Sequence, residues 1–120
     1  MINKQDFINA FNQNIEIVKG DTLAFNFQVQ GLDGSEPTFI FTVKENPDDN
    51  ILFTADLNDG ITLNSYDANK DVATYNIRIS PAKTKNLDLA RYYYDLEMNV
   101  NGDVFTLMRG RFTLLYEVSN

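Results

Sequence analysis

The chain has 120 residues, a formal net charge of -7 at pH 7 and 43% hydrophobic residues, which is enough apolar material for one domain with one core. It contains neither cysteine nor histidine, so disulfides, thiolate or imidazole nucleophiles and the usual zinc sites are excluded. The acidic charge and the scattered lysines and arginines argue against nucleic acid or a membrane as a partner, and no apolar run is long enough to span a bilayer.

Residues 1–12 are predicted to form an N-terminal arm or a short helix. Phe7 and Phe11 are spaced to share one face of a helix over residues 3–11, and so short a helix is stable only when it packs on another surface. The segment lacks the apolar stretch of a secretory signal. From residue 13 onward apolar residues recur with a period of two, and we expect residues 13–120 to form a single β domain.

The rest of the chain is predicted to consist of short strands joined by turns. Apolar and polar residues alternate along each segment, and clusters of Gly, Pro, Asn and Asp separate the segments. Residues 66–70 are expected to be a polar loop, and Ser80 and Pro81 are expected to cap and open one helical turn over residues 80–86. Seven to eight strands at intervals of about 8–12 residues are typical of a β-sandwich. The expected strands are residues 15–18, 22–30, 39–43, 51–56, 61–64, 74–79, 90–100 and 104–118.

The segment from residue 88 to residue 100 carries the most specific fold signal. Asp88, Ala90 and Tyr92 have the spacing of a tyrosine corner, in which a tyrosine hydroxyl bonds to nearby backbone at the start of a strand in immunoglobulin-like sandwiches. We therefore expect an all-β, immunoglobulin-like antiparallel β-sandwich, with Asp88 and Tyr92 in structural roles. The alternation places Tyr93 on the outward face. The inward face is expected to hold Ala90, Tyr92, Tyr94, Leu96, Met98 and Val100.

The last predicted strand indicates an interaction surface. Gly110 lies in its middle, where a glycine marks either a bulge or the close approach of another backbone, and we assign it a structural role. Apolar residues occupy both faces of this strand, with Val104 expected on the inward face and Phe105 on the outward face. The outward face is therefore expected to expose an apolar patch together with a neighbouring strand. The arm either covers this patch within the same chain or docks on a neighbouring copy, and both alternatives stay open. The expected interface residues are Phe7, Phe11, Ile40, Phe105, Leu107 and Leu115.

No catalytic or cofactor-binding residue is assigned. Asp95 and Glu97 share one strand face, but a solvated surface explains them better than the carboxylate pair of a glycosidase. Sugar binding by the single outward ring of Tyr93 is a weaker alternative, because one exposed aromatic ring is common. We therefore expect no enzymatic activity and no cofactor.

No metal-binding residue is assigned either. Asp67, Asn69 and Asp71 begin like the calcium-binding loop of an EF-hand. The Gly and the closing Glu that this loop requires are replaced by Val72 and Arg78, so an EF-hand is excluded. A weak calcium site among the loop carboxylates stays open.

Four stretches carry a resemblance to a known family: Ile15-Glu-Ile17-Val-Lys-Gly20-Asp21-Thr22 leading into Leu23-Ala-Phe25-Asn-Phe27, Asp59-Gly60-Ile61, Arg91-Tyr-Tyr-Tyr94-Asp95-Leu96-Glu97 and Thr106-Leu107-Met-Arg-Gly110-Arg-Phe112-Thr113-Leu. They resemble the N-terminal domain of phage baseplate upper proteins. This resemblance covers residues 14–119 and implies a structural protein of a phage tail or baseplate that contacts other virion proteins and forms a homo-oligomer. It also implies synthesis in the host cytoplasm and a final location in the virion.

Two other functions stay open beside this one. A carbohydrate-binding or host-surface-binding module would expose aromatic rings on loops or on a sheet face. A phage-encoded inhibitor of a host protein would gather acidic residues on one face, and the candidates are Asp48, Asp49, Asp56 and Asp59.

Overall fold

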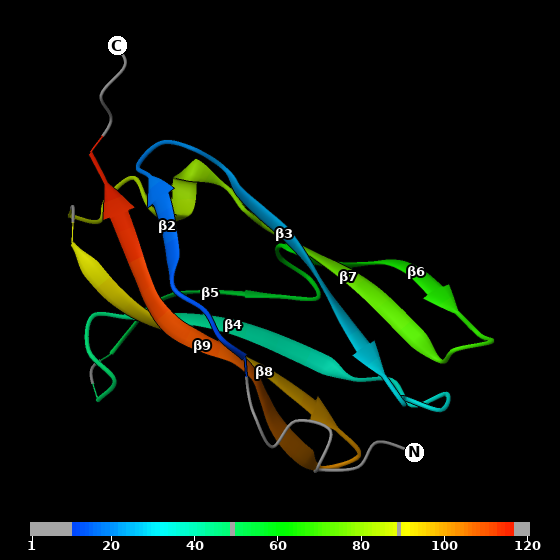
Figure 1. Cartoon of the computed structure of the whole chain (residues 1–120). Helices are drawn as coiled ribbons and strands as arrows, with labels where there is room; N and C mark the ends of the chain where they lie inside the picture. Colours follow the sequence, from blue (N-terminus) through cyan, green and yellow to red (C-terminus); the bar gives the residue numbers. More distant parts are fainter. Residues whose placement is uncertain (1–10, 49, 89, 117–120) are drawn as a thin grey trace.

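The computed structural model describes residues 11–48, 50–88 and 90–116, and strands make up most of this part of the chain (Figure 1). The expected all-β fold is confirmed, with two sheets. A single helical turn of the 3₁₀ type, η2 (Pro81–Lys83), connects β7 to β8. The strands are β1 (Phe11–Asn12), β2 (Ile15–Val18), β3 (Leu23–Gln30), β4 (Thr38–Lys44), β5 (Ile51–Asp56), β6 (Ile61–Asp67), β7 (Val72–Ile79), β8 (Arg91–Val100) and β9 (Asp103–Leu115).

The larger sheet has the order β1-β9-β8-β4-β5, and β2 also pairs with β9. β1 and β2 follow one another along the same edge of β9 and both run parallel to it, with Phe11 opposite Met108 and Ile15 opposite Phe112. Figure 1 shows β2 and β9 side by side and pointing in the same direction. The smaller sheet has the order β3-β7-β6 and is antiparallel throughout.

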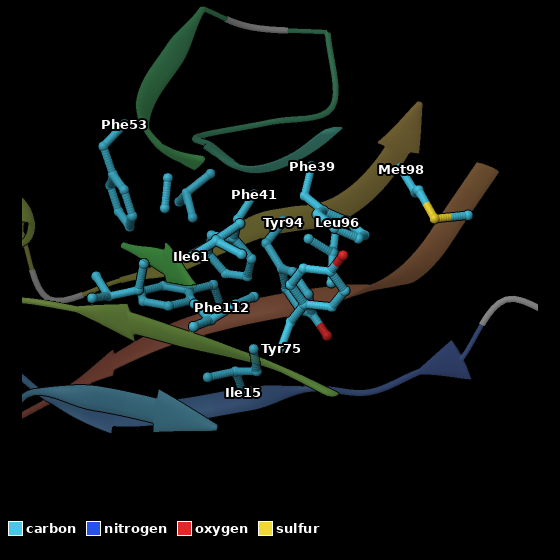
Figure 2. Close-up of a cluster of buried hydrophobic side chains, with 14 of the residues drawn as sticks. Ile15, Phe39, Phe41, Phe53, Ile61, Tyr75, Tyr94, Leu96, Met98 and Phe112 are labelled. Carbon is cyan, nitrogen blue, oxygen red and sulfur yellow. The ribbon is translucent and has the colours of Figure 1, made fainter. Parts of the chain in front are cut away.

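Aromatic side chains from both sheets form the core (Figure 2). Phe39 of β4 contacts two rings of the smaller sheet, Phe27 of β3 with ring centroids 5.1 Å apart and Tyr75 of β7 at 4.5 Å. Deeper in the larger sheet, Phe41 stacks on Tyr94 with ring centroids 5.2 Å apart. Burying one such ring contributes roughly 1.5–3 kcal/mol, and the contacts of Phe39 with Phe27 and Tyr75 join the two sheets.

The helix expected over residues 3–11 falls almost entirely outside the described part of the chain. Phe11, its last expected residue, begins β1, while residues 3–10 and the side chain of Phe11 lie outside the described part, as does Phe7. At Phe11 the helix expectation is wrong, because backbone pairing with β9 gives Phe11 and Asn12 partners that a free helical turn would lack. The last two residues of the predicted arm therefore belong to the larger sheet of the same chain.

The helical turn after β7 and the loop before it differ in detail from the expectation. Ser80 precedes η2 as expected, but its side chain makes no capping hydrogen bond, and the turn ends at Lys83. The expected loop over residues 66–70 is shorter, because β6 continues to Asp67, which pairs with Val72. Ala90, expected on the buried side, is exposed because β8 begins only after it.

A bulge in β9 reverses the expected orientation of its first residues. Leu96 pairs with Met108 and Glu97 pairs with Thr106, so Leu107 is an extra residue in β9. Because side chains alternate with a period of two, one extra residue moves every earlier side chain to the other face. Phe105, expected on the outward face, is therefore buried opposite Met98 with 6% exposure, and Val104, expected inside, is 56% exposed.

Candidate functional site

Tyr92 ties the start of β8 to the preceding turn. Its hydroxyl donates a hydrogen bond to the backbone carbonyl of Asp88 at 2.7 Å, which is the contact that the spacing of these residues predicts. Its ring is buried, and burial is the main cause that raises the pKa of Tyr92, with a smaller contribution from the carboxylate of Asp88. This contact fixes the direction in which β8 enters the larger sheet.

A second tyrosine contact crosses β9 at Gly110. The hydroxyl of Tyr94 donates to the carbonyl of Gln13 at 2.5 Å, and Gly110 is the residue of β9 that pairs with Tyr94. A Cβ atom at position 110 would lie 2.3 Å from the oxygen of Gln13, so only glycine lets the segment between β1 and β2 approach this closely. Burial raises the pKa of Tyr94 to about 12. Of the two expectations for Gly110, the close approach of another backbone is the correct one.

The predicted apolar patch does not form as one surface. β8 lies between β4 and β9, so Glu97 separates Ile40 from β9. Leu115, which is 37% exposed, lies roughly 30 Å further along β9 than Thr106, the residue that pairs with Glu97, at about 3.3 Å per residue. Leu107 is half-buried against the core, and Phe105 is buried. Of the expected interface residues with described side chains, only Ile40 and Leu115 are well exposed, at separate ends of the sheet.

Other apolar residues gather around Ile40 instead. Ile40 of β4, Leu57 of the β5–β6 turn and Val104 of β9 are all exposed and border one depression of about 480 Å³, which we call the apolar hollow. The sequence did not indicate this group, because Val104 was expected inside and Leu57 lies in a turn. The remaining residues of the apolar hollow are Thr38, Phe39, Asp56, Asn58, Glu97 and Asn99.

The middle of the same sheet carries a polar groove of about 520 Å³. β4, β8 and β9 supply most of its side chains, and the segment between β1 and β2 closes one side. Lys44, Tyr93 and Arg111 form one row across the three strands. The residues of the polar groove are Asn12, Asn14, Thr42, Lys44, Pro47, Tyr93, Tyr94, Asp95, Thr106, Arg109, Gly110 and Arg111.

A second row of the polar groove consists of Thr42, Asp95 and Arg109. Cross-strand neighbours such as these have Cβ atoms about 4.5–5.5 Å apart. The Nε group of Arg109 donates to the side-chain oxygen of Asn12 at 3.1 Å, and the backbone N–H of Arg111 donates to that of Asn14 at 3.0 Å. The two asparagines therefore hold the edge of the groove in place.

Positive charge is concentrated in the polar groove. Lys44, Arg109 and Arg111 are three of the ten basic residues of the chain, and Asp95 is one of its seventeen acidic residues. None of the three cations forms an ion pair with a residue that the structure describes. Among the described residues, the ion pair that forms joins Lys83 and Asp59, outside the polar groove. The pKa of Asp95 is raised, mainly by burial and further by the carboxylate of Glu97, although Lys44 lowers it. Asp95 is therefore less solvated than expected.

The carboxylates that resemble a calcium loop accept hydrogen bonds from the β6–β7 hairpin and from the segment between β3 and β4. Asp67 accepts a backbone hydrogen bond from Asn69 at 3.0 Å, and Asp71 accepts one from the hydroxyl of Tyr66 at 2.7 Å. Asp71 also accepts a hydrogen bond from the backbone N–H of Asp33 at 2.8 Å. Among the residues with described positions, no group of three acidic side chains lies close enough together to hold a metal ion.

No protein-family model and no curated protein matches the chain. Within the described ranges, no helix has the length and apolar character needed to cross a membrane. The polar groove and the apolar hollow are therefore interpreted from their own residues and geometry.

Proposed function

We propose that the chain is an immunoglobulin-like β-sandwich that acts as a non-enzymatic assembly module of a phage particle through protein–protein contacts. The strand order supports the fold assignment. In the letters used for immunoglobulin domains, β2-β9-β8-β4-β5 corresponds to A′-G-F-C-C′ and β3-β7-β6 corresponds to B-E-D. β2 and β9 are parallel, while the pairs among β9, β8, β4 and β5 are antiparallel.

The position of Tyr92 and Tyr94 also supports this assignment. Antibody domains place a cysteine two residues after the corner tyrosine and pack a tryptophan of strand C against the resulting disulfide. This chain has neither cysteine nor tryptophan, and Tyr94 occupies the position two residues after Tyr92. Tyr94 stacks on Phe41 of β4, so a pair of aromatic rings supplies the contact between strands C and F.

The apolar hollow is the observation that carries the assembly role. Ile40, Leu57 and Val104 come from three different elements and expose apolar side chains beside one depression, with Glu97 and Asn99 as polar neighbours. Apolar side chains surrounded by polar ones are typical of a protein–protein interface. A symmetric oligomer would use the same surface on each copy.

The phage setting and the non-enzymatic role have separate support. The stretches that resemble baseplate upper proteins include two turns: Gly20-Asp21, which lies between β2 and β3, and Asp59-Gly60, which lies between β5 and β6. The sequence lacks cysteine, so a thiolate nucleophile is removed, and it lacks histidine, the most common general base. A virion location and contacts with other virion proteins follow from this proposal.

The oligomeric state tests the proposal. We expect light scattering after size exclusion to give a discrete oligomer for the full chain and a smaller mass for Val104→Asp. Leu63→Asp is the matched control, because Leu63 is equally exposed on β6 of the smaller sheet and the substitution adds the same charge. A monomer for the unmodified chain at every concentration, or equal dissociation by both variants, would overturn assembly through the apolar hollow.

A further inference from the structure

The polar groove has the size and position of a ligand site. Its volume of about 520 Å³ falls within the roughly 300–1,000 Å³ typical of pockets for small molecules. It lies on regular strands that are fixed from the inner side by the buried contacts of Tyr92 and Tyr94. A site on rigid strands keeps its side chains in place without a ligand.

The charges of the polar groove select an anionic group. Arg109 and Arg111 lie two residues apart on the same strand face, about 7 Å at roughly 3.4 Å per residue, and Lys44 lies across β8 from Arg111. Neighbouring like charges repel one another, and none of these cations is neutralised by a described carboxylate in an ion pair. The guanidinium of Arg111 makes no side-chain hydrogen bond to a described residue, so it is available for a bidentate contact with a carboxylate.

Two other side chains narrow the class of ligand. Asp95 lies in the row beside Tyr93 and repels a ligand that carries only anionic oxygens, such as phosphate. The same carboxylate accepts hydrogen bonds from hydroxyl groups. Tyr93 exposes part of its ring between Lys44 and Arg111, and an aromatic ring packs well against the C–H face of a sugar. The ligand that satisfies all these groups carries a carboxylate, several hydroxyls and one apolar face.

We propose that the polar groove binds a sugar unit that bears a carboxylate. Arg111 and Lys44 hold the carboxylate, Asp95 accepts hydrogen bonds from the hydroxyls, and Tyr93 packs against the ring. Arg109, already held by Asn12, adds positive charge beside Asp95. This inference does not depend on the assembly role, because the polar groove and the apolar hollow share no residue.

Binding of monosaccharides to the full chain tests the inference. We would titrate the ¹⁵N-labelled protein with glucuronic acid and with N-acetylneuraminic acid, and use glucose and inorganic phosphate as comparison ligands. We expect saturable chemical-shift changes in residues 93–95 and 109–111 for at least one acidic sugar. The affinity for glucose and for phosphate is expected to be at least about tenfold weaker, which corresponds to about 1.4 kcal/mol.

Two variants with the same change in charge separate the groove from the general field of the protein. Arg111→Gln is expected to weaken binding of the acidic sugar about tenfold or more, which is the effect of losing one charge-assisted hydrogen-bonding pair. Arg78→Gln changes an exposed arginine on β7 of the smaller sheet, and we expect the affinity to stay within about twofold. Tyr93→Ser is expected to weaken binding several-fold, because it removes the aromatic ring and leaves the positive charges of the polar groove unchanged.

Each contrary result overturns the inference. No saturable change with either acidic sugar means that the groove is not a site for this class. Equal affinity for phosphate means that it is a general anion site. Equal weakening by Arg111→Gln and Arg78→Gln means that binding follows net charge and not the groove.

Discussion

The two faces of the β8–β9 pair use alternate residues of the same strands in opposite ways. On the inner face, Tyr92 and Tyr94 are buried and both hydroxyls donate to backbone carbonyls. On the outer face, Tyr93 is partly exposed and Arg111 makes no ion pair with a described residue. No buried side-chain nitrogen or oxygen lacks a hydrogen bond in the described part of the chain. We infer that the inner face determines stability and that the outer face is available for binding.

The largest effect is expected from Gly110→Ala on the inner face. The new methyl group would lie 2.3 Å from the oxygen of Gln13, so the segment between β1 and β2 must move away from β9. We expect the free energy of unfolding to fall by about 3 kcal/mol, the upper end of the usual range for overpacking. Urea unfolding followed by circular dichroism measures this loss.

Gly102→Ala is the control for this substitution. Gly102 has open space around the added methyl group but a positive φ of 84°, so only a backbone cost of about 1 kcal/mol is expected there. A loss for Gly110→Ala that is no larger than for Gly102→Ala would show that the close approach of Gln13 is unimportant.

Tyr94→Phe is expected to have the next largest effect, about 2 kcal/mol, because it leaves the carbonyl of Gln13 without its partner. Its pH dependence gives a second measurement. Tyr94 has a pKa of about 12 when folded and an ordinary value of 10.0, so the folded state holds the proton more tightly. The stabilisation is therefore fully present below pH 10 and is lost as the pH rises from 10 to about 12.

The free energy of unfolding, measured at about pH 9 and about pH 11 for both proteins, tests this pH dependence. The unmodified chain is expected to lose more stability over this interval than Tyr94→Phe, although Tyr92 and Tyr75 also have raised pKa values and keep some pH dependence in the variant. Equal losses in both proteins would contradict the assignment of this pH dependence to Tyr94.

Tyr92→Phe is expected to cost about 1–2 kcal/mol, because it removes the hydrogen bond to Asp88 but leaves the ring in place. Tyr93→Phe makes the same chemical change one residue further along β8 on the outer face. We expect a change of less than about 0.5 kcal/mol there, as for most exposed positions. Thermal unfolding of both variants gives the comparison, and similar losses would remove the distinction between the two faces.

The smallest effect on stability is expected on the outer face for Arg111→Gln, within about 0.5 kcal/mol of the unmodified chain. The guanidinium makes no ion pair with a described residue, and the backbone N–H that bonds to Asn14 is retained in the variant. Thermal unfolding without added ligand measures it. A loss above about 1 kcal/mol would mean that Arg111 is a structural residue and not a binding residue.

The sequence was sufficient where local patterns determine the structure. Alternation over residues 91–100 correctly predicted which side chains of β8 are buried, because each residue of a strand faces opposite to its neighbours. The spacing of Asp88 and Tyr92 predicted their hydrogen bond, because both residues lie within one short segment. These are the features that depend on neighbours in sequence.

The sequence was insufficient where the pairing register between strands determines which face of the sheet a side chain occupies. The bulge at Leu107 follows from how β9 aligns with β8, and no local pattern in residues 103–115 marks it. Phe105 and Val104 were therefore assigned to the wrong faces. The sequence also did not indicate the polar groove, since Lys44 and Arg111 line one groove only because β4 and β9 lie on either side of β8. Arg109 and Arg111 two residues apart were a visible signal of a shared cationic face.

The place of β9 inside the larger sheet has a consequence for synthesis of the protein. β9 is the last strand of the described chain, yet it pairs with β8 on one side and with β1 and β2 on the other, and Arg111 bonds to Asn14, which lies 97 positions earlier. Contacts of such large separation slow folding, because a long loop must close before they form. While β9 is still inside the ribosome, the nascent chain leaves the edge of β8 unpaired, and unpaired edges promote aggregation. The sheet can therefore close only after translation has passed β9.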